Sequence, residues 1–213
     1  MSEGNDLREE LVQTVHELYS RQLITATGGN VSLRIPGSDH LWITPGGLFK
    51  GDLRPEWIVR IDLHGDAVDP GAPTPSSERL THCAIYRARP NANAIVHCHA
   101  SYATILVNAG LPFLPISTEA AFLGEVGRVP FIQPGTAELA EAVVAALGAG
   151  SAVLMQNHGM IVAASSLRRA ADLAEIVERT AQVIHGCYAV GREPPTLPDE
   201  MVQHLRRLGE MMA

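Results

Sequence analysis

The sequence is almost without lysine. Lys50 is its one lysine, and the other 15 of its 16 basic residues are arginines. Lys50 lies in Phe49-Lys50-Gly51-Asp52, which reads as an exposed turn. A Schiff-base enzyme needs a buried lysine whose pKa is depressed. The sequence therefore offers no good candidate for Schiff-base catalysis.

Other features are scarce or absent. The three cysteines, Cys83, Cys98 and Cys187, are odd in number and widely spaced, which argues against a disulfide framework and fits a reducing cytoplasm. A net charge of −7 gives no basic surface for nucleic acid. No apolar run approaches membrane-spanning length, and the polar, acidic residues 1–6 are unlike a signal peptide. We therefore expect a cytoplasmic protein that binds neither nucleic acid nor membrane.

The length and composition suit one domain. The chain has 213 residues, of which 46% are hydrophobic, and it contains no internal repeat or low-complexity tract. The most linker-like stretch, Asp69 to Pro75, reads as a loop before a helix. We predict a single domain over residues 1–213.

Hydrophobic periodicity and turn residues predict intermixed helices and strands. Helices are expected over about 6–21, 76–89, 102–109, 136–147 and 166–190, with a last one after Pro198. Strands are expected over 31–34, 41–43, 57–62, 94–99, 129–132, 153–156 and 161–164. Ser76 or Ser77 is expected to cap its helix, with Glu78 in the first turn. The mixture indicates an α/β or α+β class with helices on both faces of one sheet.

Two histidines stand one residue apart in an apolar, β-prone run. Side chains on a strand alternate between its faces, so His97 and His99 project together while Cys98 points the other way into the core. Two imidazoles on one strand face can share a metal ion, and a catalytic zinc site commonly has three protein ligands and an open position. His158, in the turn Asn157-His158-Gly159 between two apolar strands, is the best candidate for the third ligand.

Glu78 is the predicted acid/base of this site. The helix that begins near Glu78 ends just before the histidine strand, so a short connection can pack this carboxylate near the metal ligands. A carboxylate there can exchange a proton with a metal-bound substrate, or occupy the open metal position itself. His82 lies four residues later on the same helical face and is expected to be a structural side-chain partner within the helix.

Three elements around this site are typical of anion binding. Thr27-Gly28-Gly29-Asn30 and Thr44-Pro45-Gly46-Gly47 lack a nucleotide-binding fingerprint but can present backbone N–H groups to an anion. Ser76 and Ser77 add hydroxyl groups at a helix N-terminus. A phosphate pocket beside the metal site is therefore plausible.

Five segments together resemble the class II aldolase/adducin family, and fuculose-phosphate aldolase is the most similar functional type. The resemblance spans roughly residues 6–190. It is carried by Thr27-Gly28-Gly29-Asn30-Val31-Ser32, Ile43-Thr44-Pro45-Gly46-Gly47, Pro75-Ser76-Ser77-Glu78, His97-Cys98-His99 and Asn157-His158-Gly159. It implies an α/β fold, a three-layer α/β/α sandwich around a central, mostly antiparallel sheet. It also implies a homotetramer with active sites at subunit interfaces.

The resemblance also implies roles for individual residues. His97, His99 and His158 match the ligands of Zn2+ or another divalent metal such as Mn2+ or Co2+, and Glu78 matches the catalytic acid/base and a possible further ligand. The residues that match the substrate-phosphate site are Gly29, Asn30, Gly46, Gly47, Ser76 and Ser77. Gly46 stands where many aldolases carry threonine or serine, and no tyrosine lies near Ile116-Ser117-Thr118, where aldolases have one that serves a neighbouring subunit.

The leading hypothesis is a metal-dependent lyase. It would cleave a small ketose or hydroxy-keto compound, expected to be a sugar phosphate, by retro-aldol chemistry through a metal-stabilised enediolate. Alternatives on the same frame are a sugar-phosphate 4-epimerase, a dehydratase or a decarboxylase, although glutamate at position 78 favours lyase chemistry over the epimerases. A non-catalytic adducin-like scaffold is a further alternative, and the complete set of metal-binding residues argues against it.

Overall fold

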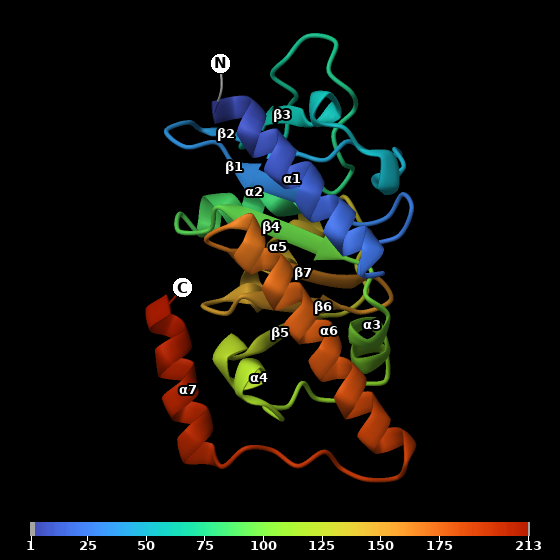
Figure 1. Ribbon diagram of the computed structural model, residues 1–213, viewed down its shortest axis with the longest axis vertical. Helices are drawn as coiled ribbons and strands as arrows, with labels where there is room; N and C mark the ends of the chain where they lie inside the picture. Colours follow the sequence, from blue (N-terminus) through green and yellow to red (C-terminus); the bar gives the residue numbers. More distant parts are fainter. Residues whose placement is uncertain (1–2, 213) are drawn as a thin grey trace.

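A mixed β-sheet forms the centre of the molecule and is covered by helices on both faces (Figure 1). The computed structural model describes residues 3–212, and within them the strand order is β3-β2-β1-β4-β7-β6-β5. Neighbouring strands are antiparallel except β5 and β6, which are parallel. The strands are β1 (Asn30–Arg34), β2 (His40–Ile43), β3 (Val59–Asp62), β4 (Ala94–Cys98), β5 (Val126–Val129), β6 (Ala152–Met155) and β7 (Gly159–Ala164). The predicted α/β sandwich is confirmed.

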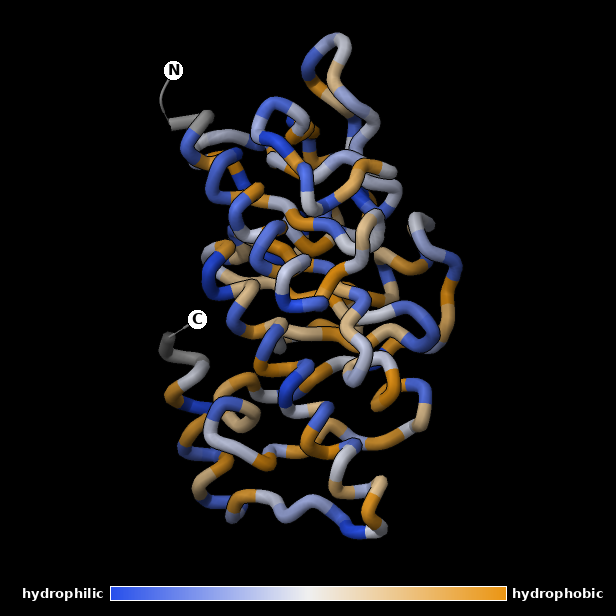
Figure 2. The backbone as a smooth tube through the Cα atoms, turned by 45° about the vertical axis from the view of Figure 1, so that its right-hand side comes forward, coloured by the Kyte–Doolittle hydropathy of each residue, from blue (hydrophilic) through white to orange (hydrophobic). Residues whose placement is uncertain are grey.

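The helices divide between the two faces of this sheet. Helices α1 (Glu3–Ser20), α3 (Ser101–Asn108) and α6 (Leu167–Ala189) share a hydrophobic core with one face. Helices α2 (Arg79–Ala88) and α5 (Ala137–Leu147) share a second core with the other face. Figure 2 shows hydrophobic segments concentrated in the middle of the molecule, as burial of both faces of a sheet requires.

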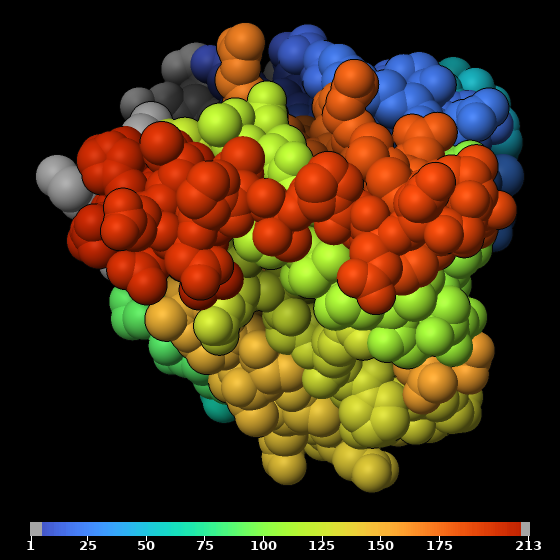
Figure 3. All heavy atoms as spheres, turned by 90° about the horizontal axis from the view of Figure 1, so that it is seen from below, coloured from blue at the N-terminus to red at the C-terminus, as the bar shows by residue number. Residues whose placement is uncertain are grey.

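Two further helices close one end of the molecule. Helix α4 (Thr118–Leu123) packs against α7 (Asp199–Met212) through a small cluster that includes Val202 and Leu205. Seen from below, the chain after α6 runs across this end, and α7, coloured red, covers part of it (Figure 3). No helix within residues 3–212 is both long enough and apolar enough to span a bilayer.

Strand β4 lies in the middle of the sheet, between β1 and β7. All five of its residues are buried, which explains its apolar sequence. Ala94, Val96 and Cys98 belong to the core beneath α1 and α6, whereas Ile95 belongs to the core beneath α2. Because side chains alternate along a strand, His97 lies on the α2 side, and Cys98 is a core residue as predicted.

Two of the predicted helix starts lie within one residue of the observed ones, Ala137 and Leu167. The side chains of Thr136 and Ser166 accept hydrogen bonds from backbone N–H groups in the first turns of α5 and α6. Caps of this kind are each worth about 1 kcal/mol. Ser117 caps α4 in the same way, although no helix was expected there from the sequence pattern.

The prediction for α2 was wrong at its start. The helix begins at Arg79, and Glu78 occupies the N-cap position, so neither Ser76 nor Ser77 is the cap. The reason is tertiary pairing: the Ser76 N–H donates to the carbonyl of Thr44, which ties Ser76 to the neighbouring loop, and a turn through Ser77 and Glu78 precedes the helix. Glu78 therefore lies at the junction between this loop and helix α2.

Two strand predictions need correction. The strand expected over 129–132 lies at Val126–Val129, because Pro130 has no N–H to continue the ladder with β6. The strand expected over 57–62 is shortened to Val59–Asp62, because a 3-10 turn, Pro55–Trp57, precedes it.

Lys50 is buried, which contradicts the expected exposed turn. Its side chain is 1% exposed, and its Nζ donates a hydrogen bond to the carbonyl of Pro45 at 3.1 Å. Residues 50–52 form a short 3-10 helix that packs against α1. Burial lowers the pKa of Lys50 below its ordinary value. The polar local sequence suggested exposure, but the side chain of Lys50 packs against the Thr44–Gly47 loop and bonds to its Pro45 carbonyl.

Candidate active site

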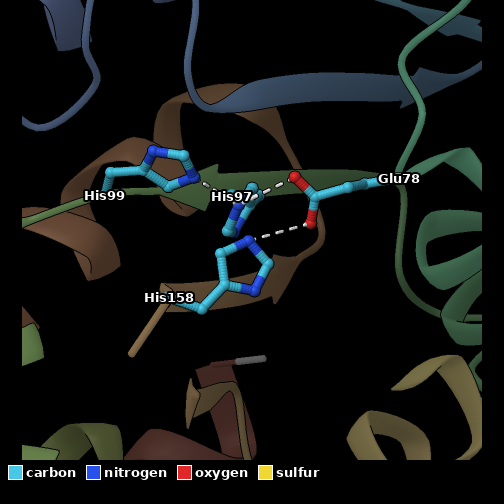
Figure 4. Close-up of side chains that lie close together, drawn as sticks. All are labelled: Glu78, His97, His99 and His158. Atoms are coloured by element: carbon cyan, nitrogen blue, oxygen red, sulfur yellow. Dashed lines mark hydrogen bonds and ion pairs between the residues drawn. The ribbon is translucent and has the colours of Figure 1, made fainter. Parts of the chain in front are cut away.

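Four side chains from three separate segments meet at one end of strand β4 (Figure 4). Glu78 comes from the start of α2, His97 and His99 from β4 and the residue just beyond it, and His158 from the turn between β6 and β7. One ligand atom from each of the four lies within 4.8 Å of those of the others. The fold thus brings together all four residues expected at the metal site.

The spacing of these atoms suits tetrahedral coordination. The His97 Nε2 atom lies 3.0 Å from His99 Nε2 and 3.2 Å from Glu78 Oε1, and His158 Nε2 lies 3.3 Å from Glu78 Oε2. A zinc ion with bonds of about 2.0–2.1 Å holds tetrahedral ligands roughly 3.3 Å apart. Imidazole and carboxylate are also ligands that divalent transition ions prefer. The donor set and its geometry therefore fit a divalent metal ion.

His97 is oriented by the neighbouring strand. Its Nδ1 lies 2.9 Å from the carbonyl oxygen of Met160 on β7, so Nδ1–H donates to that oxygen. The other ring nitrogen then presents its lone pair to the centre of the cluster. An N–H bond from a ligating histidine to a backbone carbonyl fixes both the tautomer and the ring orientation. Antiparallel pairing of Cys98 with Met160 places this carbonyl beside the ring.

His99 packs against the loop that precedes β1. A Cβ atom on Gly28 would lie 2.6 Å from His99 Nδ1, so the absence of a side chain at Gly28 makes room for the ring. Burial, together with the nearby His97 and His158, lowers the pKa of His99 to about 4. Its imidazole is therefore neutral at pH 7, as metal ligation requires.

His158 is held by a tight turn between β6 and β7. Asn157 adopts a positive φ of 55°, a conformation that asparagine tolerates better than most residues. Its N–H donates to Asn108 Oδ1 at 2.7 Å. Gly159 passes so close to β4 that a Cβ atom there would lie 2.2 Å from the carbonyl oxygen of Cys98. The sequence Asn157-His158-Gly159 thus meets the backbone requirements of the turn.

Glu78 faces both the histidines and strand β1. Its backbone N–H donates to Ser76 Oγ at 3.3 Å, and Asn30 Nδ2 donates to its Oε1 at 3.3 Å. Burial opposes ionisation of this carboxyl, but His97 and His158 outweigh that effect and hold its pKa well below the ordinary value. Glu78 is therefore a carboxylate at neutral pH and can accept a proton.

The loops expected to bind phosphate lie beside Glu78. The Gly46 N–H donates to the carbonyl of Thr74, and Pro45 pairs with Pro75, which ties the Thr44–Gly47 loop to the serine segment. Ser76 is buried, and Ser77 is exposed. The N–H of Gly46 is thus already engaged within the fold. The phosphate-binding roles of all six residues stay predictions.

The prediction for His82 was wrong about its partners. Its ring is fully buried, and it contacts Asn30 and Ser32 on β1 instead of a side chain of its own helix. Asn30 in turn contacts Glu78, so His82 belongs to the surroundings of the site. The available signal was its spacing of four residues from Glu78, on the helix face that packs on the sheet.

Comparisons with known proteins agree with this geometry. A family model described as the Class II Aldolase and Adducin N-terminal domain matches residues 9–185. A 5-deoxy-D-ribulose 1-phosphate aldolase of Bacillus thuringiensis serovar kurstaki is 34% identical over 94% of this chain and 93% of its own length. An L-fuculose phosphate aldolase of Escherichia coli K12 is 36% identical over 94% of this chain and 92% of its own.

A solved structure of an L-fuculose 1-phosphate aldolase superposes with a TM-score of 0.87 and 32% sequence identity, covering 95% of each chain. The matching family model covers most of the chain, and the relatives exceed 30% identity over nearly all of it. The family suggested by the sequence motifs is confirmed: this chain belongs to the class II aldolase and adducin family.

Proposed function

We propose that this protein is a divalent-metal-dependent aldolase that cleaves a ketose 1-phosphate. The observation that carries the proposal is the convergence of three imidazoles and one carboxylate at a spacing that fits one metal ion. The relatives described above are aldolases of phosphorylated ketoses, which supports both the lyase class and a phosphorylated small-molecule substrate.

The reaction follows from the position of the carbonyl in such a substrate. In a ketose 1-phosphate the carbonyl is C2, so retro-aldol cleavage breaks the bond between C3 and C4. The hydroxyl proton at C4 leaves, C4 becomes the aldehyde carbon, and the electron pair of the broken bond passes to C3 and the C2 oxygen. C3 then takes up a proton. The products are dihydroxyacetone phosphate and an aldehyde.

The chain's own residues divide this work. His97, His99 and His158 would hold the metal ion, and Glu78 would exchange the proton at C3. A divalent ion bound there would supply Lewis-acid stabilisation of the negative charge that develops on the substrate oxygens. Glu78 suits its role because it is ionised and 12% exposed, so it is shielded from water and still reachable by a substrate.

Phosphate would be bound by the loops that flank Glu78. The proposed contacts come from three segments of the chain, each beside the carboxylate or the strand that faces it. The residues are Gly29, Asn30, Gly46, Gly47, Ser76 and Ser77. Because the Gly46 N–H already bonds Thr74, Gly47 and the exposed hydroxyl of Ser77 are better placed to donate to an anion from these loops.

The finer identity of the protein is part of the same proposal. We expect zinc as the metal, with Mn2+ or Co2+ as possible replacements, because the ligands are three imidazoles and a carboxylate. We also expect a cytoplasmic homotetramer with active sites at subunit interfaces. The group that would accept the C4 hydroxyl proton in cleavage, and return it as an acid in the reverse reaction, is expected from a neighbouring subunit. Its identity is open, because no tyrosine lies near Ile116-Ser117-Thr118.

Two substitutions test the mechanism together. Glu78→Gln keeps the shape of the side chain and should leave the metal content intact, while kcat falls by about 10²–10⁴-fold because the proton acceptor is lost. His99→Ala removes a ligand and should lose both metal and turnover. Metal content is measured by elemental analysis of the purified protein, and turnover by formation of dihydroxyacetone phosphate. Full activity of the Glu78→Gln protein would refute the role of Glu78.

Product analysis separates the aldolase from the alternatives on the same frame. Two carbon fragments from one ketose phosphate indicate carbon–carbon cleavage between sugar carbons. A single product with the same number of carbon atoms indicates an epimerase or a dehydratase, and release of carbon dioxide indicates a decarboxylase. The aldolase names of the relatives favour the first outcome.

A further inference from the structure

A buried chain of hydrogen bonds leads away from Oε1 of Glu78, the carboxylate oxygen that Asn30 contacts. Asn30 Nδ2 lies 3.3 Å from Glu78 Oε1, and Asn30 Oδ1 lies 2.6 Å from His82 Nε2. On the other side of the ring, His82 Nδ1 lies 2.6 Å from Ser32 Oγ, which lies 3.0 Å from the hydroxyl of Tyr86. The retro-aldol mechanism described above makes no use of His82, Ser32 or Tyr86.

The direction of these hydrogen bonds follows from the placement of the Asn30 amide. Its nitrogen lies toward Glu78, where it donates to Oε1, and its oxygen lies toward His82. The Asn30 oxygen then faces His82 and accepts a bond from Nε2–H. A neutral imidazole carries one N–H, so Nδ1 of His82 has no proton and accepts a hydrogen bond from the hydroxyl of Ser32. The hydroxyl of Tyr86 can donate either to Ser32 at 3.0 Å or to the carbonyl of Asn93 at 3.4 Å.

The surroundings of His82 keep its ring in this neutral form. The ring is fully buried, and burial, assisted by His97 and opposed by Glu78, lowers the pKa of His82 to about 3. Tyr86 is also buried, and burial raises its pKa, so its hydroxyl keeps its proton. Asn30, His82 and Ser32 therefore each have defined donor and acceptor roles in this series.

We propose that His82 is a positioning residue that locks the side-chain amide of Asn30 in the one orientation that serves the active site. In that orientation one N–H of Asn30 holds Glu78, and the second N–H of the same amide is left for substrate phosphate. Without the N–H of His82, the buried oxygen of the amide loses its hydrogen-bond partner, and the side chain of Asn30 can move out of the position from which its N–H reaches Glu78. The inference rests on the proposed function for its catalytic consequence, but the orientation itself is independent of it.

A matched pair of substitutions tests the catalytic consequence. His82→Leu removes the donor and should lower kcat/KM for a ketose phosphate by about tenfold or more, with metal content unchanged. His82→Gln places an amide N–H near the position of Nε2 and should restore most of that loss. His40→Gln, at a histidine whose partner is Ser38, is the control for the exchange itself and should have no effect. Equal losses in the Leu and Gln proteins would overturn the proposal.

A double-mutant cycle shows whether His82 acts through Asn30. Asn30→Ala should itself lower kcat/KM, and His82→Leu should add almost nothing in that background, because the group it orients is gone. Additive effects of the two substitutions would mean that His82 acts by another route, and would overturn the proposal.

A spectroscopic measurement keeps the test independent of catalysis. Nitrogen chemical shifts of labelled histidine in the wild-type protein distinguish a protonated from an unprotonated ring nitrogen, with His82→Gln identifying the signals. We expect the proton of His82 on Nε2, and a proton on Nδ1 would overturn the proposal whether or not the protein is an aldolase. If the tautomer is as expected and no ketose phosphate is cleaved, the proposed function fails while the positioning of Asn30 stands.

Discussion

Gly28 offers a sharp test of how closely the fold determines the geometry of the metal ligands. A Cβ atom at this position would lie 2.6 Å from Nδ1 of His99 and 2.5 Å from Oγ1 of Thr25, whereas ordinary contacts begin at 3.4 Å. Thr25 can rotate away by giving up the hydrogen bond that it accepts from the Gly28 N–H. The ring of His99 would then have to move by roughly 0.8 Å relative to the loop.

A displacement of that size is large for a metal ligand. Metal–ligand distances are held to within about 0.2 Å, so Gly28→Ala should misplace one of three imidazoles. We expect metal affinity to fall by about 10–100-fold, the range seen when the groups that support a ligand are changed. Because Gly28 is not among the glycines with positive φ, alanine adds little backbone strain, and overpacking should cost about 1–3 kcal/mol of stability.

The assay is a competition for metal between the metal-free protein and a chromophoric chelator, with thermal unfolding measured in parallel. Gly186→Ala is the matched control, because a Cβ atom there meets nothing within 4 Å. That variant should keep its metal affinity and gain slightly in stability from the better helix propensity of alanine. A Gly28→Ala protein that binds metal as tightly as wild type would refute the argument that this glycine makes room for His99.

Three further predictions concern other residues of the fold. Asn157→Ala should lower the free energy of unfolding by about 1–2 kcal/mol because φ is 55° at this position, and Asn157→Gly should lower it by less. Chemical denaturation measures both losses, and equal losses would contradict the prediction. Burial disfavours the charged form of Lys50, so the wild-type protein should gain stability relative to Lys50→Met as the pH rises from 7 toward 10.5, the ordinary pKa of lysine. Parallel curves of unfolding free energy against pH for the two proteins would contradict this. A thiol reagent at pH 8 should label the half-buried Cys187 before the buried Cys83, whose pKa burial raises to about 11, and Cys98, whose pKa burial also raises; early labelling of Cys98 would contradict the described core.

The three histidines of the candidate metal site could be found from the sequence because each carries a local signature. His97 and His99 share a strand face by simple alternation, and Asn157-His158-Gly159 has the residues that a tight turn needs. Their convergence could not be derived from spacing alone, since it depends on the pairing of β4 with β7. This pairing brings His97 beside Ile161, which lies more than sixty residues later in the chain.

The features that escaped prediction all depend on tertiary contacts of polar groups. Lys50 reads as a surface residue until the Thr44–Gly47 loop folds over it and supplies the carbonyl of Pro45. His82 reads as a helix residue until β1 places Asn30 and Ser32 against its two nitrogens. Local sequence does not encode such pairings. Polarity therefore assigned Lys50 to the wrong environment, and helical spacing assigned His82 to the wrong partners.

The expectation of a single domain over residues 1–213 stays a prediction. The family model matches residues 9–185, and α7 lies beyond that range. It packs on α4, which belongs to the matched region, so the end of the described chain is integrated with the part that carries the family resemblance.

The cluster of Glu78, His97, His99 and His158 also affects how the protein unfolds. Glu78 and His158 are eighty positions apart in the chain, yet their side chains lie within 3.3 Å of each other. An ion held by both would act as a removable cross-link across the middle of the sequence, restricting the freedom of the denatured chain and favouring the native state by mass action. Removal of the ion by a chelator should therefore lower the stability of the whole fold. The melting temperature should then depend on the metal concentration, as enzyme turnover does.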